Sequence, residues 1–133
     1  MKKNEIVDEL IKEISHPFFA FRFSLEGLIA AIKKERAFRH ELLIGVVHLV
    51  AVLYFEMSLS YRLLLVFAWF VLLAVELLNS AIEAVVDLIS PEWHELSKRA
   101  KDCGSAAVLM ILTAGVIGWA IVLIPKVMRL VDR

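Results

Sequence analysis

"LLLVFAWFVLLAVELLNSAIEAVVD", residues 63–87, begins as an unbroken apolar run and ends with a polar residue every three or four positions. On a helix that turns about 100° per residue, these polar side chains fall within an arc of about 100°. They form a single line, which we call the polar stripe: Glu76, Asn79, Ser80, Glu83 and Asp87. Carboxylates near the end of a membrane helix cost free energy unless partners, water or a cation compensate them. The polar stripe is therefore the main indication of function in this sequence.

Composition places the chain in a membrane. It has 133 residues, of which 60% are hydrophobic, and its mean hydropathy of +0.75 lies well above that of an ordinary soluble domain. Fifteen basic and fifteen acidic residues cancel. With no dense basic patch among aromatic residues, we expect no nucleic-acid partner. The single cysteine, Cys103, excludes an intrachain disulfide and a multi-cysteine metal site. We expect it to be buried at a helix start.

Three apolar stretches predict three transmembrane helices, at about 42–57, 62–88 and 103–124, within one all-α membrane domain covering residues 1–133. The first stretch, 42–55, has only 14 uncharged residues, or about 21 Å of helix against a hydrocarbon core of about 30 Å. It therefore needs either its flanks, with the helix extending through Met57, or a locally thin bilayer. Pro125 marks the predicted end of the third helix.

The distribution of basic residues predicts the orientation. A short turn at 56–62 joins the first two predicted helices, and a polar link at 90–102 joins the second and third. The amino-terminal segment and this link carry eleven Lys and Arg, whereas the turn and the carboxyl-terminal tail carry four. By the positive-inside rule, the amino terminus and the 90–102 link face the cytoplasm.

The segment before the first span, residues 4–40, predicts interfacial helices. In 18–41, five phenylalanines and several aliphatic residues are mixed with basic residues, a composition that suits a helix lying at the membrane surface. Residues 4–15 have apolar positions at helical spacing. For these residues, membrane contact and packing against the rest of the chain are equally good interpretations.

Depth separates the carboxylates of the polar stripe. Glu76 follows the apolar run directly and lies deeper than Glu83, which is two turns, or about 10 Å, nearer the cytoplasmic end. A desolvated carboxylate suits a general base, and one near water suits a divalent cation. Asn79 and Ser80 alone are equally typical of helix–helix contacts. The chain contains no GxxxxGK[ST] or GxGxxG motif, no protein-kinase HRD or DFG motif and no HExxH motif.

Two segments carry a resemblance to a known family. "AVELLNSAIEAVVDLISPEWHELSKRAKDCGSAAVL" (74–109) and "SLEGLIAAIKKERAFRHE" (24–41) resemble the small prokaryotic diacylglycerol kinases, and the likeness runs from about 16 to 125. The resemblance implies a homotrimer of three-span subunits with an amphipathic surface helix. It also implies transfer of the γ-phosphate of Mg-ATP to diacylglycerol, giving phosphatidic acid. The enzyme would lie in the bacterial cytoplasmic membrane with its active site on the cytoplasmic side.

The family pattern also implies roles for individual residues. Two would be catalytic, the general base Glu76 and the orienting Asn79. Two carboxylates would bind Mg²⁺: Glu35 and Glu83. A larger group would contact ATP: Phe23, Glu35, Glu83, Glu92, Trp93, His94, Lys101 and Asp102. The lipid would contact Phe38, Glu41, Glu76 and Ser105.

The chain departs from the family pattern at two positions. Phe23 replaces a tyrosine near the nucleotide, and His16 replaces an arginine. Two other functions remain as alternatives. The first is a kinase for an isoprenoid alcohol such as undecaprenol. The segments NSAIEAVVD and KDCGSAAVL resemble the diacylglycerol kinases more than such enzymes, and so favour diacylglycerol as the acceptor. The second is a non-catalytic membrane scaffold, in which the polar stripe would serve assembly.

Overall fold

The computed structural model describes residues 19–132 and is helical apart from short links. The chain divides into two compact units, Met1–Glu35 and Arg36–Arg133. The described part of the first unit is a helix over residues 19–34. Within it, Arg22 Nε donates to Glu26 Oε1 at 2.8 Å, and most large apolar side chains are exposed. The interfacial role of this helix stays a prediction, and the predicted segment 4–15 lies outside the described residues.

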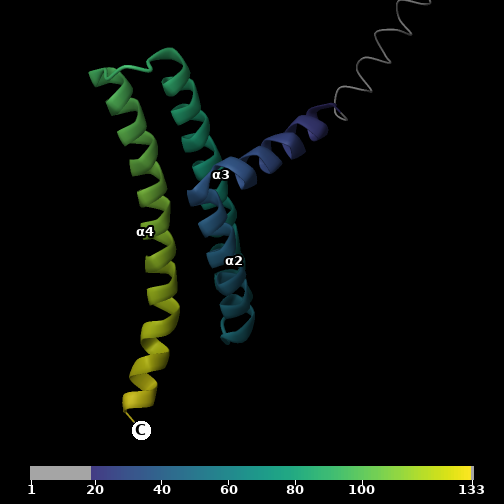
Figure 1. Cartoon of the computed structure of the whole chain (residues 1–133). Helices are drawn as coiled ribbons and strands as arrows, with labels where there is room; N and C mark the ends of the chain where they lie inside the picture. The colour runs from purple at the N-terminus through teal and green to yellow at the C-terminus, as the bar shows by residue number, and fades with distance from the viewer. Residues whose placement is uncertain (1–18, 133) are drawn as a thin grey trace, which may run out of the picture. The chain divides into compact units, whose positions relative to one another are not determined.

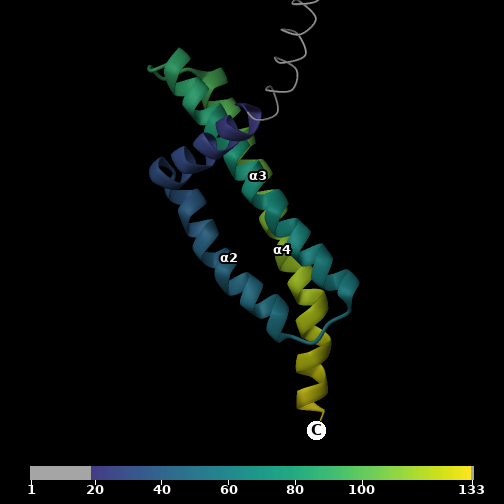
Figure 2. The ribbon, with the colours of Figure 1, turned by 90° about the vertical axis from the view of Figure 1, so that its right-hand side faces the viewer.

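The second unit consists of three long helices: α2 (Arg36–Tyr54), α3 (Leu59–Ile89) and α4 (Glu95–Val131). Short links make successive helices antiparallel, and α3 packs against both α2 and α4 (Figures 1 and 2). All three are long and apolar enough to cross a membrane. The prediction of an all-helical protein with three membrane-spanning candidates is therefore confirmed.

The first predicted span is extended at its amino-terminal end and not, as expected, at its carboxyl-terminal end. α2 has 19 residues, about 28 Å of helix, but it begins at Arg36 and ends at Tyr54. Met57 lies beyond the helix and packs against the core instead. The extension succeeds because the early turns of α2 bury Phe38 and Glu41.

α4 is longer at both ends than predicted. The link between α3 and α4 is reduced to residues 90–94, because His94 caps α4 by accepting the Leu96 N–H at 3.2 Å. The helix also continues through Pro125 to Val131. A proline removes one backbone hydrogen bond, which membrane helices tolerate. Cys103 consequently lies inside the helix, and it is exposed rather than buried.

The apolar core takes one fully packed side chain from each helix. Val52 of α2, Leu65 of α3 and Val122 of α4 form a buried cluster, against which Trp119 and Met57 also pack. These residues lie toward the end of the unit where α2 meets α3. The polar stripe occupies the other half of α3. There the contacts between α3 and α4 include the ion pair of Asp87 with Lys101.

Candidate active site

Exposure increases along the polar stripe in the order that the sequence predicts. Glu76 is 4% exposed and Asn79 8%, whereas Glu83 is half-buried and Asp87 is exposed. Glu76 and Asn79 belong to a small group of buried polar residues within 19–132 that also includes Glu41. The buried end of the stripe is thus shielded from solvent by the chain itself.

Contacts with α4 show which helix the stripe faces. Lys101 Nζ of α4 donates to Asp87 Oδ1 at 2.6 Å, and Glu83 lies within electrostatic range of the same lysine. Within α3, Asn79 Nδ2 donates to Glu83 Oε1 at 3.2 Å. The polar stripe therefore follows the interface between α3 and α4 rather than an isolated face of α3.

Helix α2 contributes a second buried carboxylate. Glu41 is 8% exposed and lies within electrostatic range of Glu76. Its Oε2 atom is buried and accepts no hydrogen bond from any residue in the described part of the chain. Two acidic side chains from neighbouring helices thus approach each other at the deep end of the site.

A polar cavity of about 380 Å³, the loop pocket, lies where α3 ends and α4 begins. Predicted ATP-contacting residues gather around it: Glu92, Trp93, His94, Lys101 and Asp102. Two ion pairs cross its wall, Lys101–Asp87 and Lys98–Asp102 at 2.5 Å. Lys101 and Asp102 are neighbours in sequence, and each pairs with a different residue.

The remaining predicted site residues lie outside the loop pocket. Phe38 is buried in α2, and Ser105 lines a shallow hollow on α4 together with Asp102. Phe23 and Glu35 belong to the other unit of the chain. Their roles stay predictions from the family pattern.

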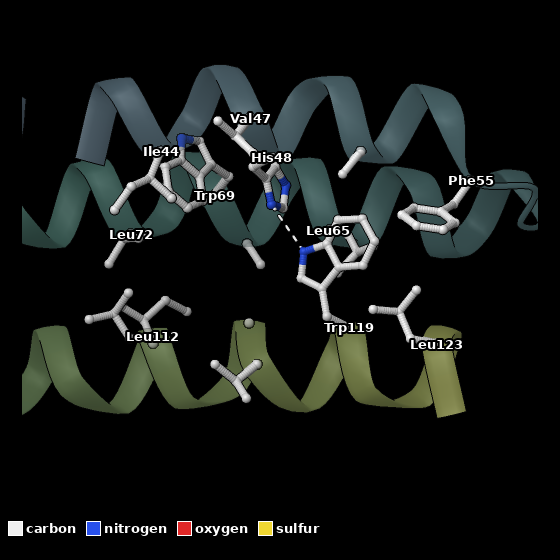
Figure 3. A pocket seen from close by; sticks show the side chains of 15 residues that line it. Ile44, Val47, His48, Phe55, Leu65, Trp69, Leu72, Leu112, Trp119 and Leu123 are labelled. Atoms are coloured by element: carbon white, nitrogen blue, oxygen red, sulfur yellow. Dashed lines mark hydrogen bonds between the residues drawn. The ribbon is translucent and has the colours of Figure 1, made fainter. Parts of the chain in front are cut away.

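The sequence did not indicate the surroundings of His48, and the structure supplies them. His48 Nδ1 accepts the indole N–H of Trp119 at 3.1 Å, and the imidazole stacks on Trp69 with ring centroids 4.8 Å apart (Figure 3). The three rings line an apolar groove of about 460 Å³ formed by α2, α3 and α4. Trp119, the hydrogen-bond partner of His48, lies 71 residues away in sequence, so no local pattern could reveal this contact.

Comparison with known proteins identifies the family of the chain. The sequence profile of the prokaryotic diacylglycerol kinases matches residues 22–123, which include the polar stripe, the loop pocket and the groove. The chain belongs to the prokaryotic diacylglycerol kinase family. The diacylglycerol kinase of Escherichia coli K12 is 49% identical over 104 residues, which cover 76% of this chain and 83% of the relative. That of Pseudomonas aeruginosa is 45% identical over 102 residues, covering 77% and 83%. That of Haemophilus influenzae is 40% identical over 106 residues, covering 80% and 90%.

The kinase family raises the question of a metal. Within residues 19–132, no three His, Cys, Asp or Glu side chains gather closely enough to hold a metal ion by themselves. Mg²⁺ does not require such a cage, because it is usually bound by one or two carboxylates together with phosphate oxygens and water. Half-buried Glu83 offers a carboxylate, the kind of oxygen donor that this ion prefers. The donor set of the site fits Mg²⁺.

Proposed function

We propose that the protein phosphorylates diacylglycerol with ATP and releases phosphatidic acid and ADP. Membership of the family makes the protein a lipid kinase, and the relatives that it resembles are named diacylglycerol kinases. The observation that carries the proposal is the α3 face on which buried Glu76 leads through Glu83 to the loop pocket. A lipid hydroxyl at the buried end and a nucleotide at the open end would meet along this face.

Glu76 is the proposed general base. Its carboxylate would take the proton of the lipid hydroxyl while the hydroxyl oxygen attacks the γ-phosphorus of ATP. The bond from the γ-phosphorus to the oxygen bridging the β-phosphate then breaks, and ADP leaves. The 4% exposure of Glu76 supports this assignment, because few water molecules can compete with the lipid hydroxyl at so buried a carboxylate. Asn79, one turn away, is proposed to orient the reacting groups.

The loop pocket is the proposed nucleotide site. Lys101 would bind phosphate oxygens, and its ion pair with Asp87 already holds the ammonium group at the pocket wall. Trp93 lies on the loop with 80% of its surface exposed, so its ring is available for stacking. Glu92, His94 and Asp102 line the same cavity. Phe23, in the first unit of the chain, is a further proposed ATP contact.

Glu83 and Glu35 are the proposed ligands of Mg²⁺. When bound, this ion neutralises negative charge on the phosphates as the phosphoryl group is transferred. The hydrogen bond from Asn79 Nδ2 fixes one carboxylate oxygen of Glu83 and leaves the other for the ion. The placement of Glu35 rests on the family pattern alone.

The lipid acceptor is proposed to contact Phe38, Glu41 and Ser105 near the carboxylates, with its hydrocarbon in the apolar groove. The groove begins at Ile44 and Leu72, each about one turn from Glu41 or Glu76. Its walls are almost entirely apolar side chains (Figure 3). An acyl chain there would leave the headgroup hydroxyl beside the two buried carboxylates.

The proposed setting is a homotrimer in the bacterial cytoplasmic membrane, with the loop pocket on the cytoplasmic side. Eleven Lys and Arg in the amino-terminal segment and the 90–102 region, against four elsewhere, support this orientation. Many large apolar side chains of α2, α3 and α4 are exposed in the single subunit. Such surface suits lipid and neighbouring subunits.

The acceptor is tested directly by incubating the purified protein with labelled ATP and Mg²⁺ in vesicles that contain both diacylglycerol and an isoprenoid alcohol. We expect label in phosphatidic acid. Label confined to the isoprenoid phosphate would replace diacylglycerol by the alternative acceptor, and an absence of labelled lipid would favour the scaffold.

A further inference from the structure

Gly104 of α4 lies buried directly against Asn79 of α3. A Cβ atom at position 104 would overlap Asn79 Oδ1 and would lie 3.2 Å from Asn79 Cγ. The same helix contains two glycines without this constraint. A Cβ at Gly115 would meet nothing within 4 Å, and one at Gly118 would meet only the end of the Leu65 side chain at 3.0 Å. Position 104 is therefore a specific close approach and not a general property of α4.

The approach confines the Asn79 amide on two sides. Its Nδ2 atom donates to Glu83 Oε1 at 3.2 Å. Its Oδ1 atom is buried against Gly104 and has no hydrogen-bond partner among residues 19–132. Because the amide group is planar and rigid, a displacement of Oδ1 also moves Nδ2. A side chain at position 104 would thus disturb the hydrogen bond that holds Glu83.

We infer that Gly104 is a positioning residue, which aligns Glu83 by letting the α4 backbone press the Asn79 amide into place. This inference rests on the proposed role of Glu83 as a Mg²⁺ ligand. If Gly104 served helix packing alone, its replacement would change stability and leave the Mg²⁺ dependence of nucleotide binding unaltered.

The test compares Gly104→Ala with the matched variant Gly115→Ala, both in the full-length protein in lipid vesicles. Binding of a non-hydrolysable ATP analogue is measured over a range of Mg²⁺ concentrations, alongside the rate of lipid phosphorylation. We expect Gly104→Ala to raise the Mg²⁺ concentration for half-maximal binding about tenfold, through loss of a hydrogen bond to a charged group. Gly115 lines the apolar groove away from Asn79, so Gly115→Ala should match the unmodified protein in the Mg²⁺ dependence of nucleotide binding.

A double-mutant cycle shows whether the effect passes through Asn79. In an Asn79→Ala background the overlap disappears, so adding Gly104→Ala should change binding and rate by less than about twofold. An equally large effect in both backgrounds would contradict the inference. So would a well-assembled Gly104→Ala protein with unchanged Mg²⁺ dependence.

Two further measurements separate this inference from the proposed function. If Glu83→Gln leaves the Mg²⁺ dependence unchanged, the metal role of Glu83 fails, and the cycle still decides whether Gly104 acts through Asn79. If Gly104→Ala does not assemble, the double variant is decisive. Assembly equal to that of Asn79→Ala supports the close contact, and failure to assemble overturns it.

Discussion

At the scale of single residues, burial distinguishes the two glutamates of the polar stripe. Glu76 is 4% exposed, so it meets water rarely and lies near a second buried carboxylate, Glu41. Glu83 is half-buried, accepts a hydrogen bond from Asn79 and lies within electrostatic range of Lys101, which lines the loop pocket. The same functional group can therefore serve as a base at one end of the stripe and as a metal ligand at the other.

Glu76→Gln keeps the shape of the side chain and removes its basic oxygen. A general base contributes about 10²–10⁴ in rate, so we expect a loss of that size in lipid phosphorylation, with ATP binding retained. Thermal stability should be equal or higher, because a buried charge in the membrane is removed. Glu56→Gln, an exposed change in the α2–α3 link, is the control and should keep normal activity. Near-normal phosphorylation by Glu76→Gln would end the general-base assignment.

Lys101 and Lys98 form similar ion pairs but are expected to differ in function. Water and salt screen both exposed pairs, so each contributes little to stability. We expect Lys101→Met to raise the KM for ATP about tenfold or more, through loss of a charge-assisted phosphate contact, with little change in melting temperature. Lys98→Met should change the KM less. Equal effects of the two substitutions would remove the special role of Lys101.

The helical repeat predicts contacts along one element and not those between elements. It placed Glu76 deeper than Glu83 from their positions along one helix, and Glu76 is indeed the less exposed of the two. It could not reveal that Lys101 pairs with Asp87, since this contact depends on the register of α4 against α3. The exposure of Cys103 was missed for a similar reason, because the true start of α4 depends on the cap at His94.

At the scale of helices, apolar length located all three elements, and capping and packing set their ends. α2 took its extra length from residues before Leu42, where Phe38 and Glu41 become buried. α4 runs on through Pro125, because one missing backbone hydrogen bond does not end a long helix whose other bonds continue. The hydropathy of a segment thus predicts that a span exists, whereas its first and last residues depend on side-chain contacts.

The hydrogen bond between Trp119 and His48 links α4 to α2 across the apolar groove. Trp119→Phe retains an aromatic ring and removes the donor, leaving His48 Nδ1 unpaired. Interhelical hydrogen bonds in membranes average about 0.6 kcal/mol, with a maximum near 1.7, so we expect a loss of stability in that range. Unfolding in a detergent titration measures it, with Trp93→Phe in the exposed loop as the control. A stability equal to that of the control would mean that the hydrogen bond contributes nothing.

At the scale of the whole molecule, the second unit contains the polar stripe, the loop pocket and the groove, and the first unit carries Phe23 and Glu35. The sequence predicted the three membrane-spanning candidates, because apolar length is a local pattern. The roles of the site residues stay predictions. The sequence could not predict how the two units combine, or which subunits of the proposed trimer share a site. These depend on contacts between distant surfaces that no periodicity encodes.

The orientation of the molecule can be tested with its own cysteine. Cys103 is the only cysteine in the sequence, is exposed, and follows Asp102 of the loop pocket directly. Because basic residues number eleven on this side against four on the other, we expect Cys103 to face the cytoplasm. A membrane-impermeant maleimide should therefore label it in inverted membrane vesicles and not in intact spheroplasts. Glu56→Cys, placed in a Cys103→Ser background, should show the opposite pattern.

Total labelling after permeabilisation corrects for shielding of either thiol in the assembled protein. The result also constrains the chemistry, because the loop pocket and Cys103 lie toward the same end of α4. The side from which Cys103 is labelled is the side from which ATP must reach Lys101. Labelling of Cys103 in intact spheroplasts would place the proposed nucleotide site on the outer face, where ATP is not supplied by metabolism. The predicted orientation and the assignment of the loop pocket to ATP would then fail together.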